Sequence, residues 1–288
     1  MLIAHLSDLH IAGPNKKAYG LAPTAENLRL AIRHLNQVGP TPDLELITGD
    51  ITYHGSSPEV SRAAKILQEL DFPYYLVPGN HDQRSTLWAE FGNTAIPGQE
   101  SEFMNYTIEG HDIRLIGMDS TAPGEPGGAM DSARCSWLEE RLAEEPNQPT
   151  VIFMHHPPVQ YGVLETDEDG FAGVQLLADV VARYDNIERI LCGHIHLEAH
   201  AGWCNTVVST APSMELQLSL DLTLTRPSEF YLASPGYQLH YLHPAGHLVS
   251  HTVFVRRLSG PFPFEEWSGD ENPPTTQNQQ RLEGNDEQ

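Results

Sequence analysis

Five apolar segments of the 288-residue chain each end in side chains that can bind a metal ion. These side chains are carboxylates, imidazoles and one amide: Asp8, His10, Asp50, Asn80, His81, His155, His156, His194 and His196. Taken together, such ligands suit iron, manganese, cobalt or zinc better than calcium. Any one of these residues could instead be a turn former or a buried histidine. Their recurrence favours a metal site, because unpaired buried imidazoles and carboxylates would destabilise the fold.

The number of donors indicates two ions rather than one. Seven ligands exceed the needs of a tetrahedral site, whereas two ions about 3.5–4 Å apart can share a carboxylate, as in two-metal hydrolases. The spacing within Asp8-Leu9-His10 and His194-Ile195-His196 also matters. In an extended backbone, side chains two positions apart point to the same side. We therefore expect both members of each pair to lie on the same side of the backbone.

An alternation of strands and helices is predicted to bring these donors together. In the first third of the chain we expect strands at 2–6, 44–47 and 74–77. We also expect one helix that is capped by Thr24 and a second helix that starts at Ser57-Pro58-Glu59. This pattern predicts right-handed crossovers and a parallel sheet. The carboxyl ends of parallel strands lie along one edge, so residues that follow the strands can converge there.

The later part of the chain continues this pattern and then turns mainly to strands. We expect a hairpin from 105–108 and 113–118, helices at 132–144 and near 171–184, and strands at 151–154, 187–191, 206–209, 237–241 and 247–255. Residues 213–235 fit neither period and predict a hairpin or flap that covers the site or pairs subunits. The chain from Ser268 onward has the composition of a disordered tail.

Charge and composition exclude several classes of partner. The net charge is −23, from 39 acidic and 16 basic residues. This charge disfavours nucleic-acid polymers and anionic membranes, which bind proteins through Lys and Arg. No apolar run is long enough to span a bilayer, and no signal peptide is recognisable. The three cysteines predict reduced thiols and a cytoplasmic protein. The apolar run Met214–Leu224 indicates a subunit interface, and hence a homo-oligomer, a dimer or higher.

Four blocks of the sequence resemble the signature of the calcineurin-like metallophosphoesterases. They are Asp8-Leu9-His10, Gly49-Asp50, Gly79-Asn80-His81-Asp82 and Gly193-His194-Ile195-His196. Residues 153–158 (Phe-Met-His-His-Pro-Pro) and 18–20 (Ala-Tyr-Gly) are similar to the branch of bacterial glycerophosphodiesterases and class III cyclic-nucleotide phosphodiesterases.

The resemblance implies an α/β fold, a four-layer αββα sandwich of two mixed sheets flanked by helices, with a small cap or dimerisation flap. The enzyme domain would cover residues 1–258, with the flap inserted at about 213–235, and a largely disordered C-terminal extension would cover 259–288.

The resemblance also assigns roles to the donors. Two ligand sets share Asp50 as the bridge: Asp8, His10 and His196 for the first metal ion, and Asn80, His155 and His194 for the second. His81 is implied to contact the phosphate or to protonate the leaving alkoxide. His156 lies next to a ligand and is expected either to orient that ligand or to face the substrate, and orientation is the preferred role.

The function implied is hydrolysis of a small phosphodiester, either a cyclic nucleotide such as cyclic AMP or a glycerophosphodiester. A hydroxide on the two metal ions would attack phosphorus in line. One alternative is a phosphomonoesterase of the same fold, and another, from a different class, is a non-catalytic interaction scaffold. The complete ligand set argues against the scaffold, and the lack of a basic stripe with aromatics argues against a nuclease.

Overall fold

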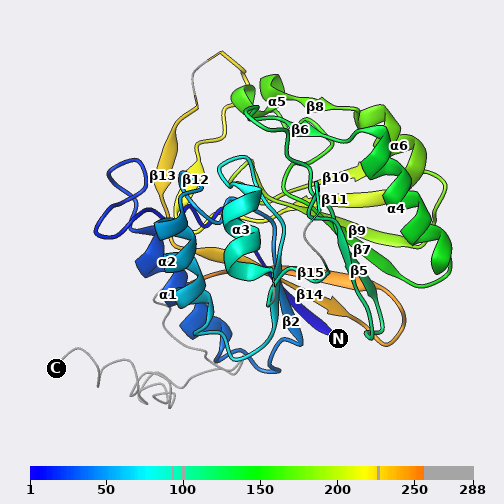
Figure 1. Ribbon diagram of the computed structural model, residues 1–288, viewed down its shortest axis with the longest axis horizontal. Helices are drawn as coiled ribbons and strands as arrows, with labels where there is room; N and C mark the ends of the chain where they lie inside the picture. The colour runs from blue at the N-terminus through cyan, green and yellow to red at the C-terminus, as the bar shows by residue number, and fades with distance from the viewer. Residues whose placement is uncertain (93, 99–100, 226–227, 256–288) are drawn as a thin grey trace, which may run out of the picture. The chain divides into compact units, whose positions relative to one another are not determined.

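The structure of the protein is a computed structural model, and the residues that it describes are 1–255, apart from 93, 99–100 and 226–227 (Figure 1). Met1–Val255 form one compact unit. The predicted tail from Ser268, the extension at 259–288 and the predicted domain end at residue 258 lie outside the described residues. No helix within the described part of the chain has the length and apolar character needed to cross a membrane.

The first sheet has the strand order β15-β14-β1-β2-β3. Its bounds are β1 Leu2–Leu6, β2 Leu44–Ile47, β3 Tyr74–Leu76, β14 Gly236–Leu242 and β15 Leu248–Phe254. The first three strands along the chain are parallel, as predicted. The sheet as a whole is mixed, because the chain returns at its end and adds β14 antiparallel to β1.

The second sheet has the order β10-β11-β9-β7-β5-β4. Its bounds are β4 Tyr106–Ile108, β5 Arg114–Gly117, β7 Thr150–Phe153, β9 Ile187–Cys192, β10 Ala199–Trp203 and β11 Thr206–Thr210. The predicted hairpin is the antiparallel pair β4–β5. Strand β10 was not predicted. It pairs antiparallel with β11, so this sheet is also mixed.

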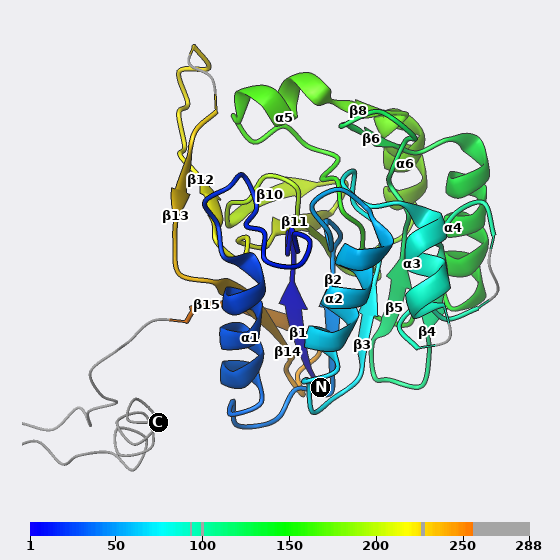
Figure 2. The ribbon, with the colours of Figure 1, turned by 60° about the vertical axis from the view of Figure 1, so that its left-hand side comes forward.

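Helices cover the outer face of each sheet, which gives the four-layer sandwich implied by the resemblance (Figures 1 and 2). On the first sheet lie α1 Thr24–Leu35, α2 Ser57–Leu67 and α3 Arg84–Phe91, and on the second α4 Ser132–Glu144 and α6 Val174–Val181. Val151, Phe153 and Leu191 of the second sheet belong to the same buried apolar cluster as Ile3 and Leu6 of the first. The two sheets therefore pack face to face.

The starts of the two N-terminal helices test the predicted caps. Ser56 forms a capping box with Glu59, and Pro58 lies in the first turn, so the start of α2 is confirmed. The prediction that Thr24 caps α1 is wrong, because the N-cap position is Pro23. The Thr24 hydroxyl instead donates to the His10 carbonyl oxygen at 2.9 Å. This bond anchors the loop that carries His10 to the start of α1.

Two further segments differ in detail from the prediction. The helix expected from about residue 171 starts at Val174, because Phe171–Ala172 form β8, which pairs with β6 Gly128–Ala129. A short helix, α5 Leu164–Asp169, precedes it. Residues 213–235 contain the antiparallel pair β12 Leu216–Leu218 and β13 Phe230–Leu232, so a hairpin is present there.

Candidate metal centre

The predicted donors lie in loops that follow five strands at one edge of the two sheets. Asp8, Asp50, Asn80, His155 and His194 come after β1, β2, β3, β7 and β9 respectively. Backbone bonds tie these loops together, from His10 N to Asp50 O at 2.8 Å and from Gly193 N to His155 O at 3.0 Å. The predicted convergence of the strand ends is confirmed.

The backbone at the donors is not extended. Five of them have a positive φ: Asp8 (54°), His10 (43°), Asp50 (50°), His194 (71°) and His196 (54°). Such angles are uncommon outside glycine and gather at functional sites, where the surrounding structure holds the strain. The expectation of an extended backbone in the two spaced pairs was therefore wrong. Tight loops beyond the strand ends aim each side chain separately.

Glycine precedes Asn80 and His194 because the carboxylates of two other donors, Asp50 and Asp8, lie close to the backbone at Gly79 and Gly193. A Cβ atom at Gly79 would lie 2.2 Å from Asp50 Oδ1. A Cβ atom at Gly193 would lie 1.8 Å from Ser7 Oγ and 2.6 Å from Asp8 Oδ2. Any side chain at either position would displace a carboxylate of the centre, which accounts for the Gly-Asn and Gly-His pairs of the sequence.

Four residues form what we call the first group: Asp8, His10, Asp50 and His196. Their candidate ligand atoms all lie within 4.8 Å of one another. His10 Nε2 is 2.9 Å from His196 Nε2 and 3.5 Å from Asp50 Oδ2. His196 Nε2 is 3.4 Å from Asp8 Oδ1. The first group thus has the atoms for one coordination site.

A second group consists of Asn80, His155 and His194. Asn80 Oδ1 lies 3.0 Å from His155 Nε2 and 3.2 Å from His194 Nδ1. His155 Nε2 is also 3.5 Å from Asp50 Oδ2, the oxygen that lies 3.5 Å from His10 in the first group. Asp50 therefore lies between the groups. The pair His194–His196 is divided between them, with His196 in the first group and His194 in the second.

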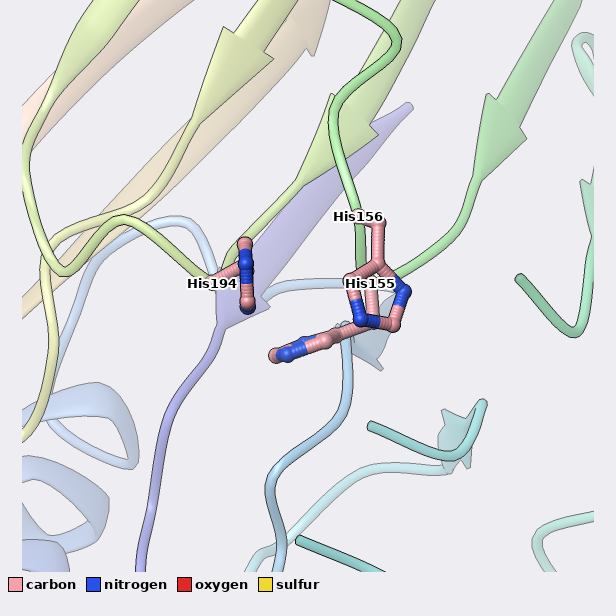
Figure 3. Close-up of side chains that lie close together, drawn as sticks. All are labelled: His155, His156 and His194. Atoms are coloured by element: carbon pink, nitrogen blue, oxygen red, sulfur yellow. The ribbon is translucent and has the colours of Figure 1, made fainter. Parts of the chain in front are cut away.

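His156 lies beside the second group but has no free ring nitrogen. One ring nitrogen from each of His155, His156 and His194 lies within 4.8 Å of the other two. Figure 3 shows the three imidazoles side by side. Its Nδ1 is 2.9 Å from Ser120 Oγ, and its Nε2 is 3.1 Å from the Pro126 carbonyl oxygen. Because both nitrogens are engaged, the Asn80 oxygen is better placed than His156 to complete the second group.

The hydrogen bonds of two histidines show that the residues fit metal ions. His155 Nδ1 donates to the Thr48 carbonyl oxygen, and His196 Nδ1 donates to the Leu216 carbonyl oxygen, each at 2.7 Å. In the neutral ring this leaves Nε2 bare, and the bare nitrogen of His155 faces another acceptor, Asn80 Oδ1, at 3.0 Å. A metal cation between two such acceptors would satisfy both of them. Backbone carbonyls that fix the tautomer in this way are typical of metal-binding histidines.

The pKa shifts of four donors favour the protonation states that bind metals, whereas Asp8 outweighs burial and raises the pKa of His196. Burial would raise the pKa of Asp8 and of Asp50, but the neighbouring imidazoles, chiefly His196 for Asp8 and His155 for Asp50, outweigh burial and lower both values. Burial lowers the pKa of His10 and of His194 to about 3. Ionised carboxylates and neutral imidazoles are the forms that coordinate divalent cations.

His81 lies against the first group without being one of its members. Its backbone N–H donates to Asp50 Oδ1, and its Nδ1 bonds to the Tyr53 carbonyl oxygen, both at 2.9 Å. The ring packs edge-on to His10, with centroids 4.8 Å apart, and stacks on Tyr53 at 6.0 Å. These contacts fix the ring, and they leave its Nε2 atom without a hydrogen-bond partner among the described residues.

The prediction from sequence assigned no role to Asp82, although it follows His81 directly. Its buried carboxylate accepts hydrogen bonds from the backbone N–H groups of Ile51 (3.0 Å), Thr52 (2.9 Å) and Gly79 (3.0 Å). Burial, and then the Asp50 carboxylate, raise its pKa to about 6. Asp82 thus ties the loop that carries Asp50 to the loop that carries Asn80. Its adjacency to Asn80 and His81 was the available signal.

Residues 1–198 match the family model of the calcineurin-like phosphoesterases. A probable glycerophosphodiester phosphodiesterase of Arcobacter nitrofigilis is 34% identical over 271 residues, 94% of this chain and 99% of that protein. A probable cyclic nucleotide phosphodiesterase of Synechococcus sp. is 30% identical over 215 residues, 75% of this chain and 81% of that protein.

The fold is also similar to that of a solved structure. A dimetal phosphatase of Danio rerio superposes with a TM-score of 0.64 at 15% identity, covering 89% of this chain and 99% of that one. The chain therefore belongs to the calcineurin-like phosphoesterase family and is an enzyme of the branch that contains these bacterial phosphodiesterases.

Proposed function

We propose that the enzyme hydrolyses small phosphodiesters with two divalent metal ions. The observation that carries this proposal is the position of Asp50 Oδ2, which lies 3.5 Å from His10 Nε2 and 3.5 Å from His155 Nε2. One carboxylate oxygen midway between two sets of donors is what a shared pair of ions requires. The names of the similar proteins support two substrate classes, glycerophosphodiesters and cyclic nucleotides.

Each ion would be held by one group, and Asp50 would serve both. Asp8, His10 and His196 would hold the first ion, and Asn80, His155 and His194 the second. The mixture of imidazole, carboxylate and amide donors suits iron, manganese, cobalt or zinc. When bound, the ions supply Lewis acidity toward the phosphate and the attacking water.

His81 is proposed to act on the leaving alcohol. The bond from its Nδ1 to the Tyr53 carbonyl oxygen fixes the ring and leaves Nε2 for the substrate. From Nε2 the protonated ring can donate a hydrogen bond or a proton to the departing oxygen. His156 is proposed to orient the second group, because its ring packs on both His155 and His194, with centroids 4.7 and 4.6 Å away.

A comparison of two aryl esters tests this proposal. Purified enzyme loaded with Mn²⁺ is expected to hydrolyse bis(p-nitrophenyl) phosphate faster than p-nitrophenyl phosphate, and Asp50→Asn is expected to abolish both activities. A faster reaction with the monoester would favour the phosphomonoesterase alternative. A metal-loaded enzyme that leaves both esters intact would favour the interaction scaffold.

The same proposal includes the setting of the enzyme. Cys135, Cys192 and Cys204 are all free, which supports a reducing compartment and thus the cytoplasm. Leu222 and Tyr231 of the 213–235 segment are 69% and 64% exposed, and they support a homo-oligomer formed through this hairpin. Light scattering of the purified protein measures the oligomeric state. The charge of −23 argues against nucleic-acid polymers as substrates.

A further inference from the structure

A cavity of about 330 Å³ lies directly beside the second group. Its lining includes His156 and His194, together with Pro157 and Pro158. The rest of the lining comes mainly from residues 159–174, the segment that contains α5 and β8 and lies at the top of Figure 1. A group held in this cavity would be adjacent to the second metal ion.

The wall of the cavity is fixed relative to the second group. β8 is held by its pairing with β6, and Gly128 N donates to Gly170 O at 3.0 Å. A Cβ atom at Gly128 would lie 2.5 Å from Phe171 Cδ2 and 2.6 Å from His156 Cβ. The bare glycine allows Phe171 to approach His156 this closely, so the cavity is formed before any substrate enters.

The lining is unfavourable to a second negative charge. It contains no Lys or Arg, and apart from the two histidines its only ionisable side chain is that of Asp167. The Asp167 carboxylate accepts hydrogen bonds from the backbone N–H groups of Tyr161 at 2.9 Å and Gly162 at 2.8 Å, which hold it in place. An anionic substituent in the cavity would meet this carboxylate and no cationic side chain of the lining, whereas a neutral or cationic substituent would not be repelled by it.

We propose that this cavity binds the alcohol that stays on phosphorus and that it selects small neutral or cationic alcohols against anionic ones. The inference rests on the proposed hydrolysis of phosphodiesters. His81, assigned to the leaving alcohol, packs on His10 of the first group, while the cavity borders His194 of the second. The cavity is also near the lower end of the range of ligand pockets, about 300–1,000 Å³, which fits an alcohol of glycerol size.

A series of p-nitrophenyl diesters tests this selectivity, because the leaving group stays constant while the retained alcohol changes. The retained alcohols are methyl, 2-methoxyethyl, 2-aminoethyl and 2-sulfoethyl. With wild-type enzyme, we expect kcat/KM for the methoxyethyl and aminoethyl esters to exceed that for the sulfoethyl ester about tenfold. Equal kcat/KM values for the methoxyethyl, aminoethyl and sulfoethyl esters would overturn the inference. Failure to hydrolyse even the methyl ester would instead contradict the proposed function, and the inference with it.

A matched pair of variants locates the effect in the cavity. Gln160→Lys adds a cation to the lining, and Gln68→Lys makes the same change at the far end of α2; both side chains are exposed. Gln160→Lys is expected to reduce the discrimination against the sulfoethyl ester about tenfold, and Gln68→Lys to leave it unchanged. Thermal unfolding confirms that both variants fold. Identical selectivity in the two variants would assign the effect to overall charge and overturn the role of the cavity.

Discussion

Asp50 of the first group also lies 3.5 Å from His155 of the second, but the two groups differ in the charge that they offer a cation. The first group contains a second carboxylate, Asp8, whereas Asn80, His155 and His194 of the second are neutral donors. Burial would lower the pKa of His196, but Asp8 outweighs burial and raises it. Burial, with the His155 imidazole, lowers the pKa of His194 to about 3 and outweighs the opposing effect of the Asp50 and Asp8 carboxylates. A cation therefore meets a more negative site in the first group.

The surroundings of the two groups differ in the same sense. The first group is closed by the base of the 213–235 hairpin, where the Leu216 carbonyl oxygen accepts from His196, and by the ring of His81. The second group borders the cavity at His194. We expect the first ion to be held tightly and the second more weakly, next to the substrate.

Removal of the shared charge should have the largest effect. Asp50→Asn keeps the size of the side chain but takes away the anion that both groups use. Turnover is expected to fall by about 10³-fold or more, which corresponds to about 4 kcal/mol of transition-state stabilisation. Metal analysis of the dialysed variant should show weaker retention of both ions. Loss of only one ion would show that Asp50 belongs to a single group.

His81 allows binding to be separated from chemistry. His81→Ala is expected to lower kcat about 10²–10⁴-fold, the usual contribution of a general acid, because the leaving alkoxide loses its proton donor. Metal content should remain that of the wild type. A parallel loss of metal would instead make His81 part of the first group. Substrates with p-nitrophenolate as the leaving group should be affected least, since this anion needs little protonation.

The charge difference between the groups can be removed by one substitution. Asn80→Asp gives the second group a carboxylate of its own and is expected to tighten the weaker of the two ions about tenfold. Titration of the metal-free protein with Mn²⁺ measures both affinities. Two affinities that stay as far apart as in the wild type would show that charge does not set the difference.

Glu45 provides a reference carboxylate, because it lies on β2 only five residues before Asp50. Both of its oxygens are buried without a hydrogen-bond partner among the described residues, and burial raises its pKa well above the ordinary value. Because the pKa of Glu45 is higher in the folded state than in the unfolded state, the protein loses stability as the pH rises from the unfolded-state pKa through the folded-state pKa.

Glu45→Gln should therefore stabilise the protein at alkaline pH. An increase in Tm of about 2–4 °C at pH 8, from about 1 kcal/mol, is expected in thermal unfolding, and a smaller gain at pH 5. Activity should not change. A uniform gain at all pH values would mean that ionisation of Glu45 is not the cause.

The parts of the fold that could be predicted from sequence depend on local patterns. The capping box at Ser56 and Glu59 and the β4–β5 hairpin are encoded by neighbouring residues. The place of β14 beside β1 depends on contacts over more than 230 residues, such as Ala4 with Leu239, and no local signal indicates it. Helix α3 was not predicted, because only two of its residues, Leu87 and Phe91, are buried.

The site residues could be predicted by type but not by arrangement. Carboxylates and imidazoles after strand ends indicated metal ligands, and the structure brings all seven together. Their positive φ angles could not be predicted, because they belong to tight loops held by glycines such as Gly193. The engagement of both His156 nitrogens depends on Ser120 and Pro126, which are distant in sequence.

The most direct test is anomalous diffraction from crystals of the enzyme loaded with Mn²⁺. We predict two peaks about 3.5–4 Å apart, one coordinated by Asp8, His10 and His196, the other by Asn80, His155 and His194, and both bonded to Asp50. A single peak at full Mn²⁺ loading, or two peaks that do not share Asp50, would contradict the binuclear centre.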